Sequence, residues 1–236
     1  MLEPILYRDG DIALTGWLAR PVGTSRAAVV VFPTIMNITP AVMAKTDALS
    51  NAGYLAFVAD FYGEAVRDFT HAGELAKALR ADVDGYRRRL RAALTTMASL
   101  DGAAGLPAMG IGFCMGGQAV LELARDGANL RAVVGFHGLL DTARPASAPI
   151  IPRLLICHGD ADRLVPREQV LAFWNEMDAV GANWHFHAYS GVEHGFTNPN
   201  PPPTGGPITY NASADRQSWA AMLELFGEVF DARRDG

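Results

Sequence analysis

The amino-acid sequence predicts an α/β fold, in which a mostly parallel β-sheet carries helices on both of its faces. From residue 28 onward, short apolar segments alternate with longer segments of helical periodicity, which is the pattern of α/β proteins. The segment "AAVVVF" at residues 27–32 is apolar at consecutive positions, as expected for a strand that is covered on both sides. Of the 236 residues 50% are hydrophobic, so a sizeable core can form, and we expect one domain over residues 1–236.

The individual elements follow from local signals along the chain. A hairpin is predicted near the N-terminus, because "DGD" at residues 9–11 separates two apolar segments. A helix is predicted over residues 40–52, with Thr39 as its N-cap and Pro40 in its first turn. The helical spacing of residues 71–100 is interrupted near Asp82, which predicts two helices. The remaining strands are expected in residues 54–60, 108–113, 131–138, 153–160 and 184–191, and the remaining helices in residues 116–126, 167–181 and 214–234.

Charge and hydropathy exclude several classes of function. The formal net charge is −5, which argues against nucleic acid as a partner, because nucleic-acid binding requires a basic surface. No apolar run approaches the roughly 18–20 residues of a membrane helix, and "MLEPILYRDGD" at the N-terminus lacks a secretory signal. We therefore expect a cytoplasmic protein that does not bind membranes. The arginines within residues 87–91 are expected to form a solvated helix face, and the oligomeric state stays open.

The segment "GFCMGG" places Cys114 in a glycine-rich turn between a predicted strand and a predicted helix. This spacing is that of a nucleophile elbow, with cysteine where serine is more familiar. Glycines suit positions 112 and 116 because the strand and the helix approach closely there, and the helix N-terminus favours a thiolate. The alternative is a buried and inert cysteine, which is how we interpret Cys157 within its apolar strand.

Two later segments supply partners for a cysteine nucleophile, which needs a general base and an acid that orients the base. The segment "CHGDADRLVP" follows a predicted strand and contains two carboxylates, Asp160 and Asp162. The segment "YSGVEHGF" follows another strand and contains His194. Hydrolases with this elbow have the chain order nucleophile, acid, histidine. The order predicts a catalytic triad of Cys114, His194 and one of the two aspartates.

Five segments together resemble the dienelactone hydrolase family of α/β-hydrolases: "GIGFCMGG", "HGDADRLVP", "YSGVEHGF", "VADFYG" and "GFHG". The resemblance extends over about residues 5–230. It implies an α/β-hydrolase three-layer sandwich and the hydrolysis of an ester or lactone by cysteine, as in a carboxymethylenebutenolidase, through a thioester. In that family the acid is the aspartate directly followed by an x-x-V-P segment, which selects Asp162.

One position departs from the family pattern. The founding members carry a glutamate that engages the resting thiol, and this chain has Thr34 at that place. A hydroxyl cannot take a proton as a carboxylate can, so we expect His194 to activate Cys114 directly. The departure weakens the expectation that dienelactone itself is the substrate.

The remaining site residues are assigned by their place at strand ends. By the geometry of the elbow, the oxyanion donors are expected to be the backbone N–H groups of Met115 and Ile35. Substrate contacts are expected from Thr34, Tyr62, His137 and Phe196. The chemistry needs no metal and no organic cofactor. His185 and His187 share one face of a strand, but no third ligand is near in sequence, and we expect both at the surface.

Two other functions remain open. The same triad could transfer the acyl group to an acceptor other than water, which would make the protein an acyltransferase. A ligand-binding module that keeps the pocket without turnover is the second alternative, and Thr34 is the feature that favours it.

Overall fold

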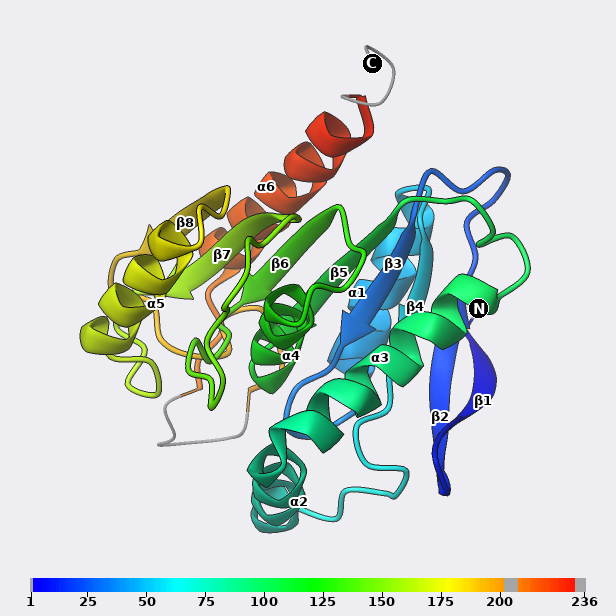
Figure 1. Ribbon diagram of the computed structural model, residues 1–236, viewed down its shortest axis with the longest axis horizontal. Helices are drawn as coiled ribbons and strands as arrows, with labels where there is room; N and C mark the ends of the chain where they lie inside the picture. Colours follow the sequence, from blue (N-terminus) through cyan, green and yellow to red (C-terminus); the bar gives the residue numbers. More distant parts are fainter. Residues whose placement is uncertain (1, 202–207, 232–236) are drawn as a thin grey trace. The chain divides into compact units, whose positions relative to one another are not determined.

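The computed structural model describes residues 2–201 and 208–231, and this part of the chain contains eight strands and six helices (Figure 1). They are β1 (Glu3–Asp9), β2 (Ile12–Ala19), β3 (Ala28–Phe32), α1 (Pro40–Asn51), β4 (Leu55–Val58), α2 (Phe69–Ala81), α3 (Val83–Ser99), β5 (Ala108–Phe113), α4 (Met115–Arg125), β6 (Ala132–Phe136), β7 (Arg153–Gly159), α5 (Arg167–Ala179), β8 (Trp184–Tyr189) and α6 (Ala212–Asp231). The strands form one sheet in the order β1-β2-β4-β3-β5-β6-β7-β8. The pairs β3–β4, β6–β7 and β7–β8 are parallel, which confirms the predicted α/β class.

The chain divides into two compact units, Met1–Gly110 and Ile111–Gly236. In the first unit β1 and β2 form the predicted antiparallel hairpin, and β2 pairs antiparallel with β4. Helix α1 packs against β2 and β4, and α3 packs against β1 and β3. Within this unit α3 crosses in front of the strands in Figure 1 and α1 lies behind them. The core of the unit lies between these layers, where every residue of β3 and β4 is buried.

Helix boundaries in the first unit follow the capping residues that the sequence contains. The Thr39 hydroxyl accepts a hydrogen bond from the Val42 N–H and caps α1. The Asp82 carboxylate accepts one from the Asp84 N–H and caps α3. Asp82 itself is extended, which separates α2 from α3 and confirms the predicted interruption.

The arginines of α3 correct one prediction. Arg87 and Arg89 are buried, not solvated. The Arg89 Nε lies 2.8 Å from Oδ2 of Asp9, and the Arg88 Nε lies 2.8 Å from its Oδ1. Burial raises the pKa of Asp9, but the hydrogen bonds from Arg89 and Arg88 outweigh it and hold the pKa below its usual value. The charge pattern alone could not show that α3 lies against β1, whose last residue is this buried aspartate.

In the second unit β6, β7 and β8 run parallel, so their carboxyl ends lie at one edge. Helix α4 packs against β6, and α6 packs against β6 and β7. Within this unit α4 lies in front of the strands in Figure 1 and α6 behind them. The Phe113 and Phe136 rings stack at 5.0 Å in the core, and Phe173 of α5 contacts Phe186 of β8. Every segment that carries a predicted triad residue follows a strand of this unit or the end of β5.

Among residues 2–201 and 208–231, no helix combines the length and the hydrophobicity needed to cross a bilayer.

Candidate active site

Cys114 is the single residue between the end of β5 and the start of α4. Its φ of 56° lies in the left-handed region, which residues other than glycine rarely adopt. The Cys114 N–H donates to the Phe136 carbonyl (3.1 Å), and the Gly117 N–H donates to the Cys114 carbonyl (2.9 Å). These bonds hold the turn against β6. The Cys114 side chain is partly exposed, whereas Cys157 is fully buried and burial raises its pKa to about 12.

The glycines around Cys114 are required by close backbone contacts. A β-carbon at position 112 would overlap the Gly116 carbonyl, as expected for an elbow in which strand and helix cross closely. A β-carbon on Gly117 would meet the backbone of Gly138, which follows β6. Larger residues at positions 112 and 117 would therefore displace the turn that presents the thiol.

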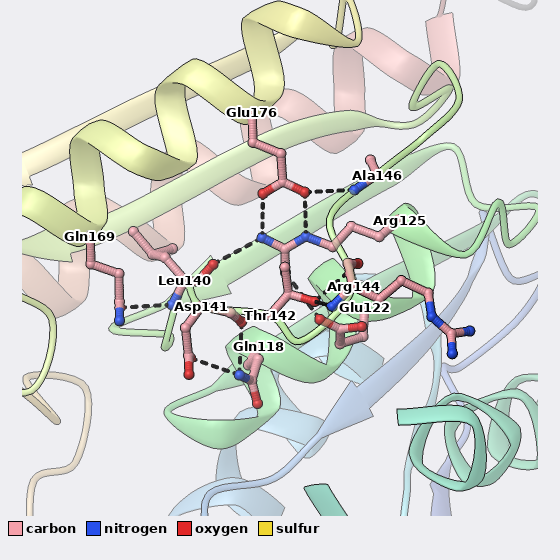
Figure 2. A network of polar contacts seen from close by, with 10 residues as sticks. All are labelled: Gln118, Glu122, Arg125, Leu140, Asp141, Thr142, Arg144, Ala146, Gln169 and Glu176. Atoms are coloured by element: carbon pink, nitrogen blue, oxygen red, sulfur yellow. Dashed lines mark hydrogen bonds and ion pairs between the residues drawn. The ribbon is translucent and has the colours of Figure 1, made fainter. Parts of the chain in front are cut away.

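Helix α4 is anchored behind the elbow by a buried polar network (Figure 2). The Arg125 guanidinium binds both carboxylate oxygens of Glu176 in α5, at 2.9 and 2.8 Å. It also contacts Glu122 (3.2 Å) and donates to the Leu140 carbonyl (2.9 Å). Near the start of the helix, the Gln118 amide donates to the backbone carbonyl and the side chain of Asp141. The network joins α4 to α5 and to the loop that follows β6.

His194 and Asp162 form a buried pair at the carboxyl edge of this unit. The His194 Nδ1 lies 2.7 Å from the Asp162 Oδ2, and 1% or less of either side chain is exposed. The other Asp162 oxygen accepts a hydrogen bond from the Leu164 N–H at 2.8 Å. Asp160 instead forms an exposed ion pair with Arg167 (2.7 Å). The structure thus brings Asp162 to the histidine and leaves Asp160 at the surface.

The charge state of His194 is set by burial on one side and by Cys114 and Asp162 on the other. Burial favours the neutral ring, but the charge of the Cys114 thiolate and the hydrogen bond with Asp162 outweigh it and raise the pKa to about 10. No hydrogen bond of ordinary geometry reaches the His194 Nε2 from the described residues. Cys114 nevertheless raises the pKa of this ring through its charge and through a side-chain hydrogen bond, so the sulfur lies close to the imidazole. This arrangement can hold a thiolate beside an imidazolium.

The backbone after His194 is tied to residues 208–211, which lie outside the strands and helices expected from the sequence. His194 forms a parallel bridge with Ile208, and the Thr209 N–H donates to the His194 carbonyl (3.1 Å). The Asn211 N–H donates to the Phe196 carbonyl at 3.1 Å. No periodicity marks these residues, and Asn211 carries the one available signal, because its side chain caps the start of α6.

His137 and Phe196 were expected to contact substrate, and the structure places the His137 ring in contact with both His194 and Phe196. The His137 ring lies 5.1 Å from the His194 ring and 5.2 Å from the Phe196 ring, nearly perpendicular to each. The His137 Nε2 lies 2.8 Å from the Thr197 hydroxyl oxygen. His137 is 2% exposed and Phe196 is 0% exposed, so their contact with a substrate stays a prediction. The sequence analysis did not identify Thr197.

The other predicted residues, Thr34, Ile35 and Tyr62, belong to the first unit. The Thr34 carbonyl accepts from the Asn37 N–H (2.9 Å), and the Thr34 hydroxyl accepts from the Met36 N–H (3.2 Å). The Tyr62 hydroxyl donates to the Ile35 carbonyl (3.0 Å). Because the C=O and N–H of a trans peptide point in opposite directions, the bond to Thr34 also sets the direction of the Ile35 N–H. Its place beside Met115 stays a prediction.

No group of three or more His, Cys, Asp or Glu side chains suited to a metal ion comes together in the described ranges. His185 and His187 are exposed on β8, as expected.

Comparison with known proteins shows similarity over nearly the whole chain. The model of the dienelactone hydrolase family matches residues 14–230. A protein of known structure named m3DLH is 33% identical, with a TM-score of 0.92 over 98% of each chain. The dienelactone hydrolase-like promiscuous phosphotriesterase P91 from metagenomic libraries is 32% identical, with a TM-score of 0.91 over 97% of this chain and 98% of that one. The uncharacterized protein K02A2.1 of Caenorhabditis elegans is 35% identical over 150 residues, 60% of this chain and 92% of that protein.

Proposed function

The chain belongs to the dienelactone hydrolase family and is a hydrolase of the α/β-hydrolase fold, and on this premise we propose that it cleaves ester or lactone bonds with Cys114 as nucleophile. His194 is the proton carrier, and Asp162 orients its ring. The observation that carries the proposal is the buried His194 imidazole, bound to Asp162 at 2.7 Å and electrostatically coupled to the Cys114 sulfur. A thiolate held beside an imidazolium is an activated nucleophile with its proton donor in reach.

The reaction proceeds in two halves. The thiolate attacks the carbonyl carbon, and the electron pair of the C=O bond moves to oxygen. When the tetrahedral intermediate collapses, the leaving alkoxide takes the proton from His194, and the acyl group remains on Cys114 as a thioester. Water then attacks the thioester and gives a proton to His194, which releases the acid and restores the thiolate–imidazolium pair.

The proposed donors to the oxyanion are the backbone N–H groups of Met115 and Ile35. Met115 opens α4, where the first N–H groups of a helix have no acceptor within the helix. The Ile35 N–H is supported by the fixed turn between Thr34 and Asn37. Each donor of this kind lowers the barrier by about 3 kcal/mol.

A panel of activated esters and simple lactones tests the proposal on the wild type and on Cys114→Ala. We expect the variant to lose turnover by roughly 1,000-fold or more, because no other group replaces the thiolate. Cys157→Ala is the matched control, since it removes the other cysteine of the chain, which is fully buried. Equal activity in wild type and Cys114→Ala would remove the assigned nucleophile. A burst that needs Cys114 would support the enzyme, and binding of an ester or lactone without any turnover would favour the binding module.

Hydrolysis of phosphotriesters is a second candidate, favoured by the similarity to P91 over nearly the full length of both chains. The same thiolate would attack phosphorus and expel the aryl or alkyl oxide, and His194 would protonate that leaving group. Water would then attack phosphorus and give a proton to His194, and the S–P bond would break to release the phosphodiester and restore the thiolate. A diethyl aryl phosphate assayed with the same variants checks this activity. Turnover that survives Cys114→Ala would exclude the shared nucleophile.

A further inference from the structure

His137 occupies a backbone position that costs strain. It follows the last residue of β6 with a φ of 40°, in a region that glycine adopts easily and histidine rarely does. Its N–H donates to the Cys157 carbonyl (2.8 Å), which ties the bend to β7. A strained residue other than glycine persists only where the surrounding structure holds it, and such positions gather at functional sites. The presence of a histidine at this position must therefore be explained by the contacts of its side chain, because its backbone conformation favours glycine.

The His137 ring lies between the two segments that carry the nucleophile and the base. It meets the His194 ring at 5.1 Å and an interplanar angle of 69°, so one ring stands edge-on to the other. On another side it meets Phe196, two residues after His194, at 5.2 Å and 78°. It also contacts Phe113, the residue before Cys114, at 6.2 Å. These contacts hold the ring in one place between the two loops.

A hydrogen bond fixes the rotation of this ring. The His137 Nε2 lies 2.8 Å from the hydroxyl oxygen of Thr197, which is three residues beyond His194 on the same loop. His137 is 2% exposed and Thr197 is 5% exposed, so water does not compete freely for this bond. Rotation of the His137 ring would leave a buried hydroxyl without this partner, which is costly.

The bond between His194 and Asp162 fixes only the Nδ1 side of the His194 ring. The ring can still tilt about that bond, and tilting would move Nε2 away from the sulfur. A second rigid contact on the ring removes this freedom, and the contact with His137 is such a contact.

We propose that His137, held by Thr197, is a positioning residue that keeps the Nε2 atom of His194 directed at Cys114. The proposal rests on the proposed function, because it concerns the same triad. It does not depend on the predicted contact of His137 with substrate, and it assigns no proton transfer to His137. In this role both residues act through His194.

The first test compares Thr197→Val with Thr197→Ser. Valine keeps the shape and removes the hydroxyl, whereas serine keeps the hydroxyl. We expect kcat to fall roughly 10-fold in Thr197→Val with KM changed less than about 2-fold, because a small misplacement of a reacting group slows chemistry more than binding. Thr197→Ser should restore most of the rate. Thr46→Val, which removes another buried threonine hydroxyl from α1, is the matched control and should keep the wild-type kcat.

The second variant is His137→Phe, which keeps a ring and loses the bond to Thr197. His137→Phe should lose kcat by the same factor as Thr197→Val. The double variant should be no slower than either single variant, because the two changes break the same hydrogen bond. If His137→Phe does not fold, His137→Asn serves, since asparagine tolerates a positive φ.

The decisive readout is the alkylation of Cys114 by iodoacetamide as a function of pH, with Cys114→Ala as background. Alkylation needs the thiolate but no substrate pocket. In Thr197→Val and the His137 variant, the midpoint should rise toward the value of about 8.5 of an ordinary thiol, because a tilted imidazolium stabilises the thiolate less. Thr197→Ser should keep the wild-type midpoint.

Two results would overturn the proposal. One is that Thr197→Val keeps the wild-type kcat and the wild-type alkylation profile. The other is that Thr197→Val has a lower melting temperature while kcat and the alkylation profile are unchanged, which would show that His137 and Thr197 only stabilise the fold. Failure of the proposed function would look different. In that case the wild type itself would show no turnover that depends on Cys114 with any ester, lactone or triester.

Discussion

The proposed reaction depends on the charge of one buried imidazole, that of His194. Burial alone would lower its pKa, and a neutral ring would then act as an ordinary general base. The Cys114 thiolate and the Asp162 carboxylate outweigh burial and raise the pKa to about 10. At neutral pH the His194 ring of the folded protein therefore carries its second proton. In the proposed reaction this ring is the proton donor, and its charge favours the thiolate form of Cys114.

This charge state predicts the pH dependence of kcat/KM, which reports the free enzyme. We expect a plateau through neutral pH and an alkaline limb near pH 10, where His194 loses the proton that the leaving group needs. The acid limb should lie below about pH 6.5, the ordinary value for histidine, because the thiolate must be protonated to break the pair. Initial rates from pH 4 to pH 11 with an activated ester measure both limbs. An acid limb centred at the ordinary histidine value with no alkaline limb would contradict the ion pair.

At the scale of elements, α4 links the turn that carries Cys114 to the interior of the second unit. Cys114 precedes its first residue, and Arg125 at its last residue binds Glu122 and Glu176. The Arg125 side chain is 1% exposed, so its charge is compensated almost entirely by these carboxylates and by the Leu140 carbonyl. Such a network stabilises the helix only while every member is present.

Glu176→Gln is expected to destabilise the protein without disabling the site. It removes one of the two carboxylates that compensate Arg125, and breaking a buried ion pair in this way costs about 3 kcal/mol in the free energy of unfolding. The elbow itself is held by the bond from Cys114 to Phe136, so kcat at 25 °C should stay close to the wild-type value. Urea titration measures the loss, and Glu224→Gln on the exposed face of α6 is the control. An unfolding curve identical to that of the control would show that the network adds no stability.

At the scale of the whole molecule, the stability of the chain should fall in acid. Asp9 is buried against Arg89 and Arg88, and its pKa is lower in the folded state than the value of about 3.9 in an unfolded chain. The unfolded state therefore binds more protons at low pH. The contribution of Asp9 is present above about pH 4 and is lost as the pH falls through the lowered pKa of the folded state.

Asp9→Asn tests this dependence. At pH 7 we expect a loss of about 3 kcal/mol, because the buried Arg89 keeps its charge without its carboxylate. Between pH 5 and pH 2.5 the variant should lose less stability than the wild type, since it has no carboxylate to protonate at this position. Denaturant titrations at four pH values in this range measure both slopes. Parallel slopes in the two proteins would rule out Asp9 as a source of the acid sensitivity.

Much of the architecture could be predicted because its signals are local. Thr39 and Asp82 cap helix starts by accepting hydrogen bonds from residues two or three positions later in the chain. Consecutive apolar residues predict the buried strand β3. The elbow is local for the same reason, since Gly112 and Gly116 are near neighbours in sequence and a β-carbon at position 112 would overlap the Gly116 carbonyl. The burial of Arg89 could not be predicted, because it depends on the packing of α3 against β1.

The sequence by itself determined the alternation of strands and helices, the glycine turn around Cys114, and the order of cysteine, aspartate and histidine along the chain. The family resemblance selected Asp162 over Asp160, but only the tertiary structure showed the bond between Asp162 and His194 and the ion pair of Asp160 with Arg167. It alone also showed that His137 contacts the His194 ring and bonds to Thr197. The physical reason is the range of the interactions involved. Backbone sterics and capping bonds act over a few residues, whereas side-chain contacts between strand ends depend on the parallel register that brings distant segments to one edge.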